Sequence, residues 1–210
     1  MKRLALYLFL VLMTLNDPIA EGQSKYYHRQ QPVSGYGIKA GINYAGQSTS
    51  NKAAEVSSSE IMGINAGGYF NYFFLGSVAV QAEFLVSGKG SHWKDYYDEA
   101  KDIVSYIDLP VMIRYQPIKF MNVHAGPQAG MRLGAKQKDM KTGIKADIKD
   151  YYKTFDFGFV FGAEADLPYN LNITLRYIMG ISPATTSVRY VDPWMNNLFQ
   201  ISLGCRLAGK

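Results

Sequence analysis

The chain has 210 residues, of which 48% are hydrophobic and 14% aromatic, and its formal net charge is +5. Two of the positive charges lie at the very N-terminus, so the remainder is only mildly basic, which argues against a nucleic-acid-binding protein. Beyond the N-terminal segment no stretch reaches the roughly 18 apolar residues of a transmembrane helix, and the single cysteine, Cys205, excludes an intramolecular disulfide.

The N-terminus has the pattern of a secretory signal peptide. Lys2 and Arg3 precede an apolar run over residues 4–15, which is too short to span a bilayer as a helix. Cleavage after Ala20 and cleavage after Gly22 both fit, and we place the signal peptide at residues 1–22. Residues 23–34 are polar and are expected to form a periplasmic segment, followed by one domain over residues 35–207.

Alternation of apolar and polar residues predicts eight strands in that domain. It is clearest over residues 121–134, where Met121 and Val123 begin one face and Asn122 and His124 begin the other. This length exceeds the roughly 9 to 11 residues that a tilted membrane-spanning strand requires. In chain order the strands are predicted at residues 35–44, 62–72, 77–88, 103–116, 121–134, 154–166, 171–181 and 197–207.

The connections between these segments alternate between short and long. Short ones are expected at residues 73–76, 117–120 and 167–170, and long polar ones at residues 45–61, 89–102, 135–153 and 182–196. This is the pattern of an all-β, eight-stranded, antiparallel up-and-down transmembrane β-barrel in the outer membrane, with its short turns in the periplasm. The alternative is a soluble lipocalin-like barrel, which would place its apolar residues inside.

Aromatic residues near both strand ends predict two girdles at the membrane surfaces. At the turn end they are Tyr36, Tyr72, Phe73, Phe74, Tyr115, Phe120 and Tyr169, and at the loop end Tyr44, Trp93, Tyr152, Phe155 and Phe199. Pro110 and Pro127 fall inside predicted strands of a barrel without edges, so we expect bulges or local twists there.

Charged residues on the polar faces predict an ion-paired lumen. Eight strands leave an interior just wide enough for side chains, so we expect a closed barrel rather than a pore. The predicted lumen charge network comprises Lys39, Glu83, Asp108, Arg114, Arg132, Asp156, Glu164 and Arg176. Within it we expect a salt bridge between Arg132 and Asp156, in a register that places Gln128 opposite Val160 and His124 opposite Glu164.

The external loops carry the other candidate residues. The third long loop spaces five lysines that could contact lipopolysaccharide phosphates, although a solvated mixed-charge loop also fits. These are Lys136, Lys138, Lys141, Lys145 and Lys149. In the second loop Ser91, His92 and Asp95 are the only external candidates for catalysis, and we expect no enzyme activity, no metal site and no cofactor.

Five runs of sequence resemble the strand signatures of PorT-like outer-membrane β-barrel proteins. They are GIKAGINYA at residues 37–45, QAEFLVSGKG at 81–90, YIDLPVMIRY at 106–115, HAGPQAGMRLGAK at 124–136 and FDFGFVFGAEAD at 155–166. The resemblance implies an eight-stranded outer-membrane barrel, and the namesake member supports protein export by the type IX route. The chain departs from most barrels in ending its last strand near Leu207 rather than in an aromatic residue.

We therefore expect a small closed outer-membrane barrel with a structural or accessory role. The alternatives are an accessory component of type IX secretion, with secretion-machinery proteins as partners, and a barrel that binds a small solute or lipid.

Overall fold

The structure is a computed structural model that describes residues 34–49, 57–94, 99–186 and 194–209. The predicted signal peptide at residues 1–22, and all but the last residue of the predicted periplasmic segment at 23–34, lie outside the described residues.

Within the described part of the chain, eight long strands run antiparallel to their neighbours. They are β1 (Gly35–Thr49), β3 (Ile61–Leu75), β4 (Val78–Lys94), β5 (Glu99–Ile118), β6 (Met121–Asp139), β8 (Phe155–Asp166), β9 (Leu171–Gly180) and β10 (Trp194–Gly209). Two short strands, β2 (Ser57–Ser59) and β7 (Lys145–Asp147), extend the sheet beside β4 and β6. A 3-10 helix, η1 (Lys149–Tyr151), follows β7. Among these residues no helix is long and apolar enough to cross a membrane.

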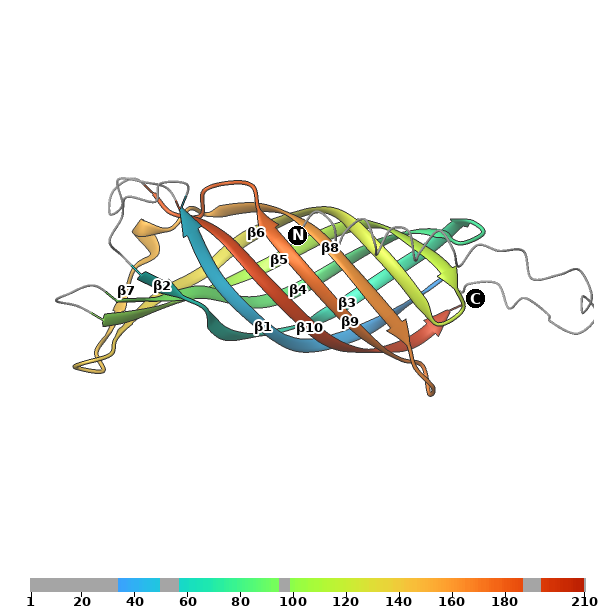
Figure 1. Cartoon of the computed structure of the whole chain (residues 1–210), viewed down its shortest axis with the longest axis horizontal. Helices are drawn as coiled ribbons and strands as arrows, with labels where there is room; N and C mark the ends of the chain where they lie inside the picture. The colour runs from blue at the N-terminus through green and yellow to red at the C-terminus, as the bar shows by residue number, and fades with distance from the viewer. Residues whose placement is uncertain (1–33, 50–56, 95–98, 187–193, 210) are drawn as a thin grey trace, which may run out of the picture. The chain divides into compact units, whose positions relative to one another are not determined.

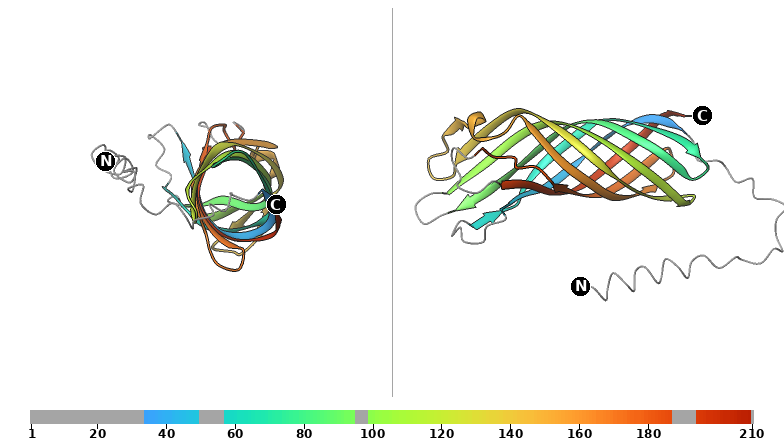
Figure 2. Two further views of the ribbon diagram at one scale, coloured as in Figure 1. Left: turned by 90° about the vertical axis from the view of Figure 1, so that its right-hand side faces the viewer. Right: turned by 90° about the horizontal axis from the view of Figure 1, so that it is seen from above.

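The eight long strands close into a ring. Each pairs with its neighbours in the chain, and β1 pairs with β10 from Gly35 opposite Gly209 to Thr49 opposite Trp194. The left panel of Figure 2 looks along this ring and shows the strands surrounding one lumen. The predicted eight-stranded up-and-down barrel is therefore confirmed.

The two ends of the barrel differ in their connections. The tight turns between β3 and β4, β5 and β6, and β8 and β9 lie at one end, here called the turn end. The turn after β8 places Tyr169 and Asn170 at φ values of 63° and 61°, a conformation typical of tight hairpin turns. The opposite end carries the longer connections and is called the loop end (Figure 1).

At the loop end the strands extend further than predicted. β4 continues to Lys94, β5 begins at Glu99 and β6 continues to Asp139, whereas the sequence pattern predicted strand ends at residues 88, 103 and 134. Cross-strand pairing continues through these residues, so the β4–β5–β6 part of the sheet projects beyond β1 and β10 on the left of Figure 1.

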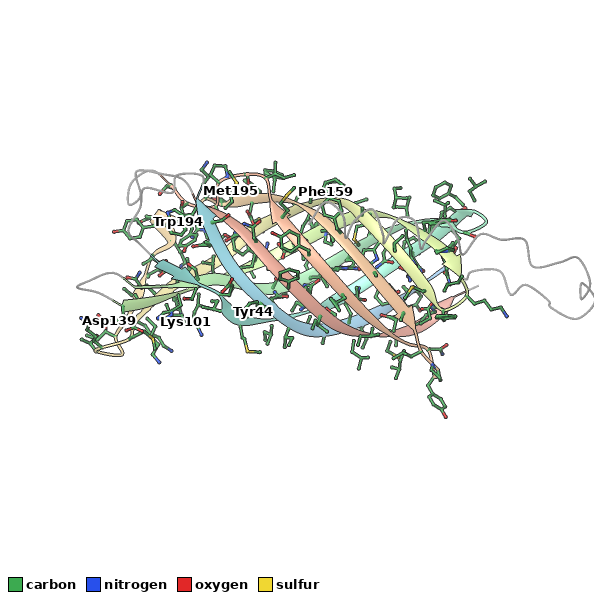
Figure 3. The ribbon with its side chains drawn as sticks, in the orientation of Figure 1. Tyr44, Lys101, Asp139, Phe159, Trp194 and Met195 are labelled. Atoms are coloured by element: carbon green, nitrogen blue, oxygen red, sulfur yellow. The ribbon has the colours of Figure 1, made fainter. Side chains whose placement is uncertain are left out.

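Apolar side chains face outward and polar side chains face the lumen. On β1, Ile38 and Ile42 are 55% and 46% exposed, whereas Lys39 and Asn43 are buried. Figure 3 shows Tyr44 from the same strand on the outside of the barrel. A barrel in water would have the opposite arrangement, so the soluble lipocalin-like alternative is wrong, and the outer wall is suited to lipid.

Most of the predicted girdle residues lie on this outer wall. The exposed ones are Tyr36, Tyr44, Tyr72, Phe74, Tyr115, Phe120, Phe155, Tyr169 and Phe199. Two assignments are wrong: Phe73 points inward, with its ring 5.9 Å from the Arg114 guanidinium, and Tyr152 is buried at the loop end of the lumen. The Trp93 side chain lies outside the described residues.

Of the bulges or local twists expected at the two prolines, the bulges are absent from the described ladders. Register is unchanged across Pro110 and across Pro127 in the described strands. Instead, two pairs are missing from each ladder beside β5. In the β4–β5 ladder the gap lies between the pairs Ala82–Val111 and Leu85–Asp108. In the β5–β6 ladder it lies between the pairs Pro110–Gln128 and Ile113–Ala125. Losing the proline N–H donor thus interrupts pairing without shifting it.

A bulge does occur higher on β6. Tyr106 pairs with Arg132 while Ser105 pairs with Gly134, so Leu133 is an extra residue on β6. An inserted residue reverses which alternate side chains face inward. Below the bulge His124 and Gln128 face the lumen, whereas above it Ala135 is buried and Lys136 is exposed.

Candidate functional site: the charged lumen

The turn-end half of the lumen is organised around Glu83 on β4. Its carboxylate accepts hydrogen bonds from Arg176 Nη1 and Nη2 on β9, both at 2.6 Å, and from Lys39 Nζ on β1 at 2.8 Å. Gln81 Nε2 donates a further bond at 2.6 Å. In the ring, three strands lie between β4 and β9 in either direction, so the bidentate Glu83–Arg176 pair crosses the full width of the lumen.

A second ion pair lies beside the first. Arg114 Nη1 on β5 contacts Glu164 Oε1 on β8 at 2.8 Å, and Thr174 Oγ1 donates to Glu164 Oε2 at 2.9 Å. Arg114 also donates to Gln81 Oε1 at 3.1 Å, which joins this pair to the Glu83 group. Nearer the turn end, Asp166 contacts Arg206 at 3.4 Å, and both side chains are about a quarter exposed.

His124 on β6 completes this layer. Arg176 Nε donates to His124 Nε2 at 2.8 Å, and because an arginine is always a donor, Nε2 must be the unprotonated nitrogen. His124 Nδ1 faces Asn122 Oδ1 at 3.4 Å and is then the donor of a neutral imidazole. His124 is therefore an uncharged spacer between strands.

Above the ion pairs lies a layer of neutral polar side chains and then an apolar layer. Asn43 Nδ2 donates to Ser87 Oγ at 2.8 Å, and Asn43 Oδ1 accepts from Asn65 at 2.9 Å and from Gln200 at 3.0 Å. The apolar layer consists of a cluster of buried residues from five strands. They are Ala45, Met112, Val160, Ile178 and Leu198.

Toward the loop end, Lys89 on β4 is the centre of a second charged group. Its ammonium contacts Asp108 Oδ1 at 2.9 Å and Asp156 Oδ2 at 3.1 Å, and it lies 4.6 Å from the centre of the Tyr106 ring. Asn196 Nδ2 on β10 donates to Asp156 Oδ2 at 3.1 Å and to the Tyr106 hydroxyl oxygen at 3.4 Å. β10 and β5 are on opposite sides of the ring, so this group also spans the lumen.

The top of the lumen is covered by Tyr152, just after η1. Its hydroxyl donates to Asp102 Oδ2 at 2.9 Å. Its ring packs with Val104, Ala135 and Ile148 in a buried apolar cluster. The segment between β7 and β8 therefore folds inward over the loop end rather than outward into solvent.

Glycines make room for these long side chains. A Cβ atom at Gly162 would lie 2.6 Å from His124 Nε2 and 2.7 Å from Arg176 Cγ, and one at Gly130 would lie 2.7 Å from Asp108 Oδ1. All three distances are too short for real contacts, so a side chain at either position would displace members of the charged groups.

Of the eight residues predicted for the lumen charge network, the structure brings seven into the two groups. Lys39, Glu83, Arg114, Glu164 and Arg176 lie together at the turn end, and Asp108 and Asp156 flank Lys89 at the loop end. Arg132 lies apart from them, and its Nε donates to the Lys153 carbonyl at 3.3 Å in an exposed position.

The predicted Arg132–Asp156 salt bridge is wrong. Asp156 lies opposite Gly130, Gln128 lies opposite Gly158 and His124 lies opposite Gly162, so the register differs from the prediction by two residues. A shift of two keeps every side chain on its face, so alternation cannot detect it. In the observed register Asp156 contacts Lys89 instead.

Sequence reasoning missed Lys89 and Asp102 because both fell in a predicted loop. The signal was present: Lys89 continues the alternation of Gln81, Glu83 and Ser87, and all four are buried. The predicted strand ends too early, at Gly88, whereas β4 continues to Lys94.

The candidate catalytic residues of the second loop do not form a pair. Ser91 is buried in the lumen and donates to Gln47 Oε1 at 2.8 Å, whereas His92, the next residue of the same strand, is partly exposed and contacts Glu99 at 3.1 Å. Adjacent residues of a strand point to opposite faces, so His92 cannot act as a base for Ser91. Asp95 lies outside the described residues. Within the described ranges, no group of three His, Cys, Asp or Glu side chains could hold a metal ion.

An apolar outer wall around a lumen filled with ion pairs defines a small transmembrane β-barrel. The chain belongs to the outer membrane protein beta-barrel domain family, whose model matches residues 29–186. It is thus a small outer-membrane β-barrel protein.

Solved structures of other small barrels are similar to it. Ail, the attachment invasion locus protein of Yersinia pestis, has a TM-score of 0.50 and 13% sequence identity, covering 82% of this chain and 97% of Ail. Neisserial surface protein A has a TM-score of 0.52 and 11% identity, covering 84% of this chain and 100% of that protein. At these identities the likeness shows the fold alone. No curated protein sequence matches the chain.

Proposed function

We propose that the protein is a closed, non-conducting barrel with a structural or accessory role in the outer membrane and no catalytic activity. The observation that carries the proposal is the bidentate ion pair between Glu83 and Arg176, which joins opposite walls of the ring. Its side chains are almost completely buried, and the apolar layer of Met112, Val160 and Ile178 lies above it.

The energetics favour a plug over a hydrated channel. Charges removed from water are stable only when paired and hydrogen-bonded, and each of Glu83, Glu164 and Lys89 has at least two such partners. Moving these groups aside to open a path would separate several pairs at once.

Single-channel recording in planar bilayers tests the proposal. We expect the wild-type protein to show no discrete conductance steps. A Glu83→Gly, Lys89→Gly, Met112→Gly, Arg176→Gly variant, which shortens side chains in both charged groups and in the apolar layer, serves as the control for a detectable opening. Stable conductance steps from the wild-type protein would overturn the closed lumen.

A second proposed role is that of an accessory component of type IX secretion, supported by the PorT-like resemblance. The two most family-specific runs lie on β5 and β6, and their prolines, Pro110 and Pro127, sit where the ladders beside β5 are interrupted. Affinity purification from outer membranes in mild detergent tests this role. Recovery of secretion proteins would favour it, and a barrel recovered alone would favour the structural role.

The remaining alternative is that the barrel binds a small solute or a lipid. The filled lumen leaves no support for a solute inside, whereas the apolar outer wall supports a lipid bound outside. At the loop end a groove lies beside exposed Ile103 and Leu133 on the lipid-facing side.

A further inference from the structure

Three lysines form a row across the outer face of the barrel at the loop end. Lys138 on β6 lies directly opposite Lys101 on β5 and directly opposite Lys145 on β7. Directly paired residues of antiparallel strands point to the same side, and neighbouring strands are about 4.8 Å apart. The row therefore places three like charges within about 10 Å. Figure 3 shows Lys101 at this end of the barrel, near Asp139.

The bulge at Leu133 directs the lysines of β6 outward. Below the bulge, the even-numbered residues of β6, such as His124 and Gln128, face the lumen. Continued without interruption, that alternation would bring Lys136 and Lys138 inside. The inserted residue reverses it, so Gln137 bonds Asp102 at 2.8 Å on the inner side while both lysines face out.

Four lysines on this outer face, Lys101, Lys136, Lys138 and Lys145, are here called the lysine patch. Of these, Lys136 alone lies opposite a carboxylate in the described ladders, that of Asp147, whose ion pair is with Lys149. The four make no ion pair within 4.0 Å in the described part of the chain, whereas Lys149 contacts Asp147 at 3.1 Å and Glu99 contacts His92. Like charges directly opposite each other destabilise a ladder. An anion bound across the row would remove that repulsion.

Three members of the lysine patch line a groove that continues onto the lipid-facing wall. The groove has a volume of about 430 Å³, and it is lined by Lys136, Lys138 and Lys145 together with Ile103 and Leu133. Ile103 follows Lys101 by two residues on the same face, which places it about 7 Å nearer the membrane. The site thus presents cations at the headgroup level and apolar side chains below them.

We propose that the lysine patch binds the phosphorylated headgroup of lipopolysaccharide, with an acyl chain against Ile103 and Leu133. The loop end faces the outside of a barrel whose short turns are periplasmic, so this is the leaflet in which that lipid lies. A row of cations about 10 Å long fits a headgroup with more than one phosphate better than a single phosphodiester. Lys141, also predicted from the sequence to contact lipopolysaccharide, does not line the groove. The proposal does not depend on a closed lumen.

Titration of the full chain in zwitterionic detergent with purified lipopolysaccharide tests the site. Each basic residue near an anionic lipid surface lowers the Kd about fivefold. The triple variant Lys101→Gln, Lys138→Gln, Lys145→Gln should therefore raise the Kd for lipopolysaccharide on the order of a hundredfold. The matched control, Lys119→Gln, Lys141→Gln, Lys153→Gln, removes the same charge away from the lysine patch and should change the Kd less than threefold. Equal losses in the two triple variants would overturn the site.

Two further measurements make the test independent of folding defects and of general surface charge. Lys138→Glu should raise the thermal stability of the free protein, because it replaces two like-charge pairs by opposite-charge pairs, and yet it should weaken lipopolysaccharide binding. Dephosphorylated lipopolysaccharide and phosphatidylglycerol should each bind at least tenfold more weakly than intact lipopolysaccharide. Equal binding of phosphatidylglycerol would refute the assignment to lipopolysaccharide.

Discussion

Removing the Glu83 carboxylate should be one of the most destabilising single changes in the barrel. Glu83→Ala leaves Lys39 and Arg176 buried, with side chains about 1% exposed, and without the carboxylate they share. Breaking a buried ion pair by deleting one partner costs about 3 to 5 kcal/mol, because the remaining charge stays out of water without compensation. Here a single deletion leaves two cations, so we expect the upper part of that range.

Replacing all three charges should cost less than removing one. In a Lys39→Met, Glu83→Met, Arg176→Met variant no buried charge of this group is left unpaired, and such apolar replacements are often neutral or stabilising. What remains is the loss of one hydrogen bond each to Gln81 and His124, about 0.5 to 1.5 kcal/mol per bond, which stays below the cost of Glu83→Ala. The order of stabilities, rather than any single value, tests whether burial of charge controls the lumen.

The measurement is the free energy of unfolding in lipid vesicles, followed by urea titration and by the shift between folded and unfolded bands on unboiled gels. A conservative Glu83→Gln variant, which keeps the volume and loses the charge, should resemble Glu83→Ala. If Glu83→Ala cost less than about 1 kcal/mol, as for a solvated ion pair, the lumen would be hydrated and the closed-barrel reasoning would fail.

Three more predictions concern the wall, the packing of the lumen and the loop end. Phe161→Arg, at a lipid-facing position in the middle of β8, should destabilise the barrel by about 2 to 4 kcal/mol. Phe155→Arg, at the loop end of the same strand, should cost about 1 kcal/mol or less. Equal free energies of unfolding for the two variants in vesicles would contradict the membrane placement. Gly162→Ala should cost about 1 to 3 kcal/mol because its Cβ would overlap His124 and Arg176, whereas Gly134→Ala, where nothing lies within 4 Å, should be nearly neutral in the same assay. Backbone N–H groups of Thr142 and Lys141 donate to the carboxylate of Asp139 and lower its pKa. The contribution of these hydrogen bonds to stability is therefore complete above the ordinary pKa of an aspartate and is lost as pH falls through the lowered pKa. Amide chemical shifts of Lys141 and Thr142 should follow that titration in the wild type and not in Asp139→Asn.

Alternation of residue types was sufficient to predict the barrel because the bilayer selects strongly for it. Outward residues, such as Ile38, must suit lipid, and most inward residues, such as Lys39, are polar and bond to one another, so a period of two recurs in every strand. The short turns predicted which strands are neighbours, because strands joined by a tight turn pair with each other. Both signals are local, and the fold follows from them without any knowledge of distant contacts.

The pairing of charges could not be obtained in the same way, because it depends on register. The predicted Arg132–Asp156 pair and the observed alignment of Gly130 with Asp156 differ by two residues and leave every face unchanged. What distinguishes the two registers is the partner across the lumen: Lys89 contacts both Asp108 and Asp156, and it lies on β4, three places from β8 in the ring. No pattern within β6 and β8 contains that information.

The loop end shows how one inserted residue changes chemistry rather than fold. With Leu133 inserted, the lysines of β6 face the membrane surface, and Ala135 can pack against Tyr152 inside. In a regular ladder Lys136 and Lys138 would enter the lumen, where Lys89 already contacts the carboxylates of Asp108 and Asp156. A bulge is therefore the simplest way for this strand to supply polar side chains to the lumen at one end and cations to the outer surface at the other.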